Sequence, residues 1–337
     1  MDGVLGKFKR YLIKYRIALV AGIISAVLTF SVVAAFLCRN YAIGLIKNQF
    51  YVLGTALNSV GLDYAYDDIS FYSFSPWQII RIKNIKFYSV KDNTISWTID
   101  ELNVDVGLWD YENIHIFLSS KQTIQKGKDI WDVFVPVSEI SLALKANGLE
   151  DVVLKSEDIQ VKNLIKIDDL VFKIKNDEKK GISVDLNVKG VVIDDMTGWT
   201  LNKEIDHVVV EASLQEVWNE DMAFNDMVYN WLKKGGNIKV NRVILNWKPL
   251  ISVASGVMQF SEKFEPKVSL NTASIALIET LEKLNDQGFI SNKGTFVVKI
   301  LLENKAKKQR ATDKHKMVVS PLKISKDKIL LENIRIR

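Results

Sequence analysis

From Leu62 to the C-terminus, apolar and polar residues alternate, and this period of two is the feature that most limits the fold. Neighbouring side chains of a β-strand point to opposite faces, so alternation marks strands with one covered and one solvated face. Such strands are typical of antiparallel sheets. The clearest sets are Leu170, Phe172 and Ile174; Val184, Leu186 and Val188; Val208, Val210, Ala212 and Leu214; Phe296, Val298, Ile300 and Leu302; and Ile334 with Ile336.

Two of the alternating stretches change parity midway, which indicates a bend within a strand. In the first, Trp97 and Ile99 are followed by Leu102, Val104 and Val106; in the second, Ile238 and Val240 are followed by Val243, Leu245 and Trp247. A change of parity requires a bulge or twist that keeps the apolar residues on one face. Long, strongly curved sheets contain such devices, so we expect a curved sheet.

Two segments of helical periodicity interrupt the strands. One covers residues 218–234 and ends at Gly235-Gly236, and the other covers residues 274–287 and ends at Gly288. We expect both helices to cover a sheet face. The chain after the N-terminal region is therefore predicted to be α+β but mostly β, with two possible lobes at 62–217 and 218–337.

Residues 17–38 form an uncharged run, which predicts a transmembrane helix. Twenty-two residues at about 1.5 Å each give roughly 33 Å, enough to cross a hydrocarbon core of about 30 Å. Residues 1–16 form a basic tail, which predicts a cytoplasmic N-terminus and places the rest on the far side of the membrane. A lipoprotein site at Cys38 and a signal-peptidase site at 33–35 are alternatives. The large Leu37 before Cys38 disfavours the first, and the run is longer than the apolar region of a usual signal peptide, which favours an uncleaved anchor.

Residues 39–61 are amphipathic and precede the β-rich part. Their apolar positions recur at helical spacing and Gly61 closes the segment, so we expect a juxtamembrane helix. Its apolar stripe faces either lipid or the core of the following domain, and we favour the core.

Charge separates the tail from the folded part. Residues 39–337 hold 40 basic against 39 acidic residues, which excludes the basic surplus of a nucleic-acid-binding surface. One segment is rich in basic residues and contains a single acidic residue, Asp313. Its basic residues are Lys305, Lys307, Lys308, Arg310, Lys314 and Lys316. It is either a solvated hairpin loop or a loop that contacts lipid headgroups, because cations near an anionic bilayer gain roughly 1 kcal/mol each.

Residues suited to catalysis or metal binding do not cluster in the sequence. His115, His207 and His315 lie far apart and have no second ligand at metal-site spacing, so each is interpreted as a surface or loop residue. The pairs Asp67-Asp68, Asp168-Asp169 and Asp194-Asp195 are interpreted as turn or strand-end residues. No nucleotide-binding glycine loop or serine-hydrolase elbow occurs. We therefore expect a protein without catalytic residues, cofactor or metal.

Three stretches resemble the uncharacterised bacterial family known as domain of unknown function 2125. They are GLDYAYDDISFYSFSPW (residues 61–77), GGNIKVNRVILNWKPLISVASGVMQF (235–260) and PLKISKDKILLENIRI (321–336). The turn at 73–76 lacks the glycine typical of that family. More remotely, an anchor followed by a curved sheet resembles AsmA-like envelope proteins, which are thought to carry lipids along an apolar groove. These resemblances imply a bacterial inner-membrane protein whose C-terminal domain is periplasmic.

Two functional hypotheses follow. In the first, the apolar face of the curved sheet binds lipid or another apolar ligand without catalysis. In the second, the domain has a closed core and acts as a scaffold that contacts envelope proteins through exposed aromatic residues such as Trp77 or Trp109.

Overall fold

The structure is a computed structural model. It describes residues 54, 58, 61–71, 77–90, 95–107, 112–145, 148–162, 164–177, 181–194, 202–214, 230–261, 265–308, 317–325 and 328–336. The predicted tail (1–16) and membrane run (17–38) lie outside these residues, as does most of 39–61. Gly54 and Asn58 are helical, and Gly61 follows at φ 80°, as a helix-ending glycine does. Within the described part of the chain, no helix is long and apolar enough to cross a bilayer.

The described residues form one sheet of 18 strands, in which every pairing is antiparallel. The strands are β1 (Leu62–Ala65), β2 (Asp68–Phe71), β3 (Trp77–Ser89), β4 (Ile95–Gly107), β5 (Asn113–Leu118), β6 (Lys121–Lys126), β7 (Asp129–Phe134), β8 (Val137–Lys145), β9 (Gly148–Val161), β10 (Ile165–Asp177), β11 (Gly181–Ile193), β12 (Glu204–Leu214), β13 (Asn237–Trp247), β14 (Leu250–Phe260), β15 (Pro266–Ile275), β16 (Val318–Ser325), β17 (Lys328–Leu331) and β18 (Ile334–Arg335). The prediction of a mostly β, mainly antiparallel chain is confirmed.

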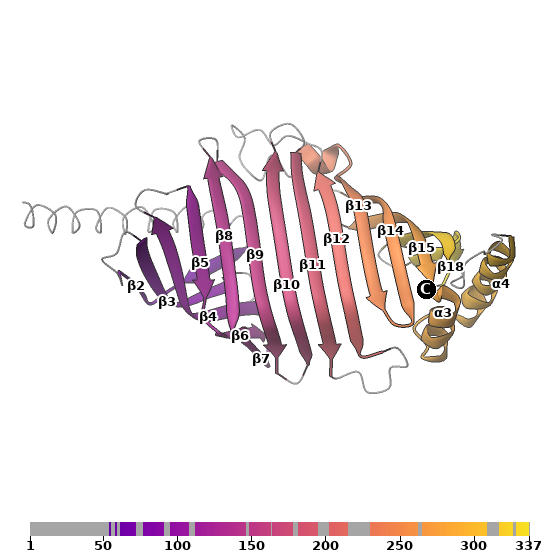
Figure 1. The fold of residues 1–337 in the computed structure, drawn as a ribbon, viewed down its shortest axis with the longest axis horizontal. Coiled ribbons are helices and arrows are strands. Elements are labelled where there is room, and N and C mark those ends of the chain that lie inside the picture. The colour runs from indigo at the N-terminus through magenta and orange to yellow at the C-terminus, as the bar shows by residue number, and fades with distance from the viewer. Residues whose placement is uncertain are drawn as a thin grey trace, which may run out of the picture.

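The topology is a meander of consecutive antiparallel strands, three of which are each divided into two segments. β1 and β2 both pair with β3, and β5 and β6 both pair with β4, so each of these two pairs is one bent strand. β7 and β8 likewise form one bent strand against β9. From β9 to β18 the order in the sheet follows the order in the chain. Figure 1 shows β8 to β12 side by side, while β6 and β7 lie behind β9.

A transverse row of irregular residues crosses the first half of this sheet, and we call it the crease. Extending the strand registers shows that its members face one another in adjacent strands. The crease consists of Asp67, Asn84, Asp100, Ser120, Pro136, Asp158, Asp168, Gly190 and Asp206. Three of them have left-handed backbones: Asn84 at φ 50°, Asp158 at φ 51° and Gly190 at φ 60°. Asp67, Ser120 and Pro136 lie in the breaks between paired half-strands.

The crease explains the parity change predicted at residues 97–106. A residue outside the β region interrupts the two-residue alternation, so apolar side chains an odd number apart share a face. Ile82 and Ile85, on either side of Asn84, are both fully buried in one cluster, and Ile99 and Leu102 join them. The second predicted change is also confirmed, because the β13–β14 register shifts between Val240 and Val243.

Two helices follow β15, and one of them corrects a prediction. α3 (Leu277–Asp286) lies within the expected segment 274–287 and is followed by Gly288 at φ 74°. Residues Phe296, Val298, Ile300 and Leu302, predicted as a strand, belong instead to α4 (Asn292–Lys308). The seven residues 296–302 contain six apolar ones, so they fit a helix as well as a strand. Ser291 favours the helix over a strand, because its Oγ accepts a hydrogen bond from the Gly294 N–H and so caps the start of α4.

The predicted helix at 218–234 is described only at its end, where residues 230–233 are helical. The proposed lobe boundary near 217 also lies outside the described residues. The strands on either side, β12 and β13, are paired within the same sheet.

Buried side chains gather in two clusters near the ends of the sheet. The first consists of Ile80, Ile82, Ile85, Ile99, Leu102 and Val104 from β3 and β4. The second lies under the helices and consists of Leu281, Val298, Leu302, Val318, Leu331 and Ile336. Strands β9 to β12 lie between these two clusters in the sheet.

A candidate apolar binding face

One face of β9 to β12 carries ten apolar side chains, and we call it the apolar face. It is formed by Val152, Leu154, Leu170, Phe172, Ile174, Val184, Leu186, Val188, Val208 and Val210. The register aligns these side chains in rows across the strands: Phe172 pairs with Leu154 and with Leu186, which in turn pairs with Val210. Paired residues of antiparallel strands lie on the same face, so the rows are continuous.

The exposure of the apolar face differs from that of the two clusters. All ten of its side chains are half-buried, whereas Ile82 in the first cluster and Leu302 in the second are 0% exposed. A side chain in a closed core is normally surrounded on all sides. The apolar face is thus flanked by its strand neighbours but retains access from above.

The described helices do not lie over the apolar face. α3 and α4 contact each other, and they pack against β14, β16 and β18. Figure 1 shows both helices beyond β15, at the end of the long axis opposite to β2 and β3. The described helices therefore cover the C-terminal end of the sheet. Strands β9 to β12 contact mainly the neighbouring strands with which they pair.

The opposite face of the same strands is polar and charged. Lys189 lies 3.6 Å from Asp169, and Lys175 lies 4.0 Å from Asp151. Arg242 forms an ion pair with Glu211, which raises the pKa of Arg242 mainly through their hydrogen bond. Such exposed pairs are each worth little, roughly 0–1 kcal/mol, but they mark this face as solvated. The two faces of β9 to β12 therefore differ in polarity.

The cationic segment predicted to contact headgroups begins in a helix, not in a hairpin loop. Lys305 lies in α4, where its Nζ is 2.7 Å from Glu332, and Lys307 and Lys308 end the same helix. Arg310, Lys314 and Lys316 lie outside the described residues. Trp109 is outside as well, and Trp77 begins β3.

Two of the three histidines, His115 and His207, lie within strands on the charged face. His115 Nδ1 is 2.8 Å from Glu139 Oε1, and the Ser141 hydroxyl donates to the same oxygen. These two hydrogen bonds, that of His115 first, lower the pKa of Glu139. His207 Nε2 is 2.8 Å from Asn187. His115 is partly exposed, as predicted for a surface residue, whereas His315 is not described.

One of the three acidic pairs differs in position from the prediction. Asp67 lies in a strand break and Asp194 follows β11, as expected. Asp168-Asp169, however, lie in the middle of β10, because the crease passes there. Their carboxylates have separate partners, Lys166 and Lys189. Among the residues that the structure describes, no three His, Cys, Asp or Glu side chains gather as metal ligands.

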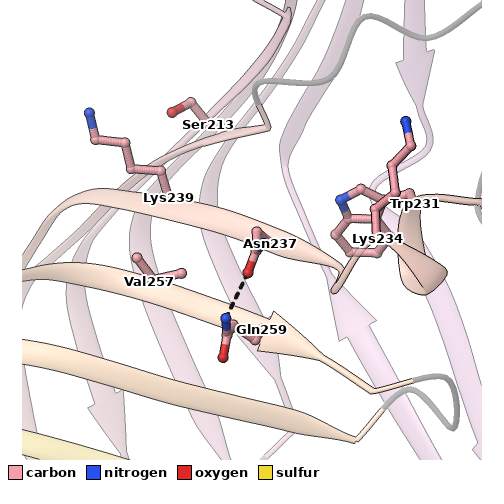
Figure 2. A pocket seen from close by; sticks show the side chains of 7 residues that line it. All are labelled: Ser213, Trp231, Lys234, Asn237, Lys239, Val257 and Gln259. Atoms are coloured by element: carbon pink, nitrogen blue, oxygen red, sulfur yellow. Dashed lines mark hydrogen bonds between the residues drawn. The ribbon is translucent and has the colours of Figure 1, made fainter.

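A cavity of about 500 Å³ occurs on the charged face near the end of β12, and no sequence motif predicted it. It is lined by Ser213, Trp231, Lys234, Asn237, Lys239, Val257 and Gln259. Figure 2 shows that Gln259 hydrogen-bonds Asn237 at its floor, with a donor–acceptor distance of 2.9 Å. The residues come from three strands and from the helical segment 230–233, so only the folded sheet brings them together.

Comparison with known protein families, with curated proteins and with solved structures found no match for this chain.

Proposed function

We propose that this protein binds the acyl chains of a lipid, or a similarly apolar ligand, along the apolar face, without catalysing a reaction. The observation that carries the proposal is the continuous, half-buried apolar surface of β9 to β12, which the described helices leave uncovered. Removal of apolar surface from water yields about 25 cal/mol per Å². An acyl chain lying across these rows would remove apolar surface from water and would not contact the charged face.

The predicted membrane anchor supports the same proposal. A transmembrane helix at residues 17–38 would hold the sheet at a bilayer, where lipid is available. We propose a bacterial inner-membrane location with a cytoplasmic N-terminus and a periplasmic sheet, because residues 1–16 are basic. Transfer of lipid along the meander towards its C-terminal end would then be passive.

Photo-crosslinking tests the proposal at two adjacent residues of β10. Phe172 lies on the apolar face, whereas Val171 pairs with Asn187 on the charged face. A photoreactive amino acid introduced in place of Phe172, in the full chain in its native membrane, is expected to capture lipid, which mass spectrometry identifies. The same substitution at Val171 provides the matched control. Equal labelling at both positions, or none at Phe172, would show that the face does not hold lipid.

A scaffold function is the second proposal, and one observation favours it. On the charged side of the C-terminal strands, Ile251, Val253, Val257 and Val319 are all exposed. Val253 and Val319 both lie opposite Ala273, so they border one surface. Exposed apolar patches of this kind are typical of contacts with other proteins. Crosslinking from Val253 in cells should trap a defined envelope protein if this patch is a scaffold surface.

A further inference from the structure

Helix α4 is apolar on both of its sides, although only one side packs against the sheet. Val298 and Leu302 face inward and are 0% exposed in the second cluster. On the other side, Phe296 is 66% exposed, Val297 45%, Ile300 43% and Leu301 39%. These four residues follow helical spacing and form a single stripe, which we call the outer stripe. Packing of α4 against the sheet does not explain why the outer stripe is apolar.

The charges around the outer stripe are mainly positive. α4 contains five lysines and one glutamate. Two of the helix lysines are already engaged: Lys299 hydrogen-bonds Glu282, and Lys305 pairs with Glu332. Lys293, which is exposed, precedes the stripe by one turn. The surplus therefore remains positive at both ends of the stripe.

The position of α4 in the fold makes the stripe accessible. Figure 1 shows α4 at the tip of the long axis, where its inner side contacts β16 and β18. β2 and β3, which follow the predicted anchor, lie at the opposite tip. A surface that meets α4 end-on would not collide with the rest of the sheet.

We propose that α4 docks on the surface of an anionic lipid bilayer, with the outer stripe inserted among the acyl chains. Phe, Val, Ile and Leu side chains flanked by lysines are the composition of a helix that lies in the membrane interface. Their burial supplies the apolar part of the binding, and the lysines add attraction to anionic headgroups. A protein partner with an apolar groove would not require this positive surplus. The proposal depends on α4 alone and stands even if the apolar face binds no lipid.

An environment-sensitive fluorophore on α4 tests the docking. The chain has a single cysteine, so Cys38→Ser with Val297→Cys places one label in the outer stripe. The full chain is held in phosphatidylcholine nanodiscs, and vesicles containing phosphatidylglycerol are added. We expect a blue shift, quenching by lipids with brominated acyl chains, and weaker binding as salt rises. A second label, at Val253→Cys on the exposed sheet surface, serves as the matched control.

The double substitution Phe296→Asp with Ile300→Asp, made in the labelled chain, should reduce vesicle binding at least tenfold. Both residues are exposed, so the urea midpoint should stay unchanged, and a matched pair, Val253→Asp with Val319→Asp, should leave vesicle binding intact. The proposal is overturned if the label on Val297 does not respond to anionic vesicles. It is equally overturned if the control label responds as strongly, or if the dye shifts only on addition of a protein fraction.

Discussion

At the scale of single residues, the crease depends on side chains that tolerate or support a left-handed backbone. This conformation costs roughly 1–2 kcal/mol for most residues, and Gly, Asn and Asp adopt it most readily. Asn84 is also held in place, because its Nδ2 donates a hydrogen bond of 2.6 Å to Asp67 in the neighbouring bent strand. The three left-handed positions are Asn, Asp and Gly, so the residue types match the requirement of the backbone.

Gly190 provides a test of the crease. A Cβ at this position would lie 2.0 Å from Asp168 Oδ2, and the backbone is left-handed. We expect Gly190→Ala to lower the free energy of unfolding by about 1–3 kcal/mol, measured by urea titration. Gly127→Ala is the control, because Gly127 has the same backbone hand at φ +62° but open space around it. Equal losses in the two variants would mean that contact with Asp168 is unimportant.

The His115–Glu139 pair predicts a pH effect. The pKa of Glu139 lies below its ordinary value of 4.5, mainly because of its hydrogen bond with His115. The pair therefore stabilises the fold above about pH 4.5, and this stabilisation is lost as the pH falls through the lowered pKa. His115→Asn should raise the Glu139 pKa, followed by NMR titration of its carboxyl carbon. His207→Asn should leave that pKa unchanged; a shift there of the same size would contradict the assignment.

At the scale of elements, α4 has a buried inner side and an exposed outer side, so residues adjacent in its sequence differ in exposure. Leu302 is 0% exposed, whereas Leu301 is 39% exposed. Leu302→Ala should lower the free energy of unfolding by about 2–5 kcal/mol, because it removes buried methyl groups and leaves a cavity. Leu301→Ala should change it by no more than about 0.5 kcal/mol. Urea titration followed by circular dichroism measures both, and similar values would show that α4 does not pack as described.

The strands could be predicted because alternation is a local signal, and the parity change at residues 97–106 even located a bend. α4 could not be distinguished from a strand, since six of its seven residues from 296 to 302 are apolar and the Ser291 cap lies upstream. The alignment of the crease residues could not be predicted either, because a single sequence does not show which residues of neighbouring strands lie opposite each other. For the apolar face, the alternating sets named most of its residues, but only the pairing registers join them into rows.

At the scale of the whole molecule, the described helices cover the C-terminal end of the sheet and do not cover β9 to β12. Leu186→Lys places a lysine on the apolar face, while Asp185→Lys places a lysine on the opposite face. If the apolar face holds lipid, the first variant should retain several-fold less lipid on purification in mild detergent than the second. Mass spectrometry of organic extracts gives the amount per protein. Equal lipid content in the two variants would argue against binding at this face.

The crease also limits how the gene of such a protein can change in length. Insertion of one residue into a strand, on one side of the crease, would shift the remaining residues of that strand out of register with both neighbouring strands. Their apolar side chains would then point to the opposite face and be exposed to water. Adding or removing a complete up-and-down pair of strands keeps every other row in place. Homologues should therefore differ in size by whole hairpins, and their sheets should be longer or shorter by an even number of strands.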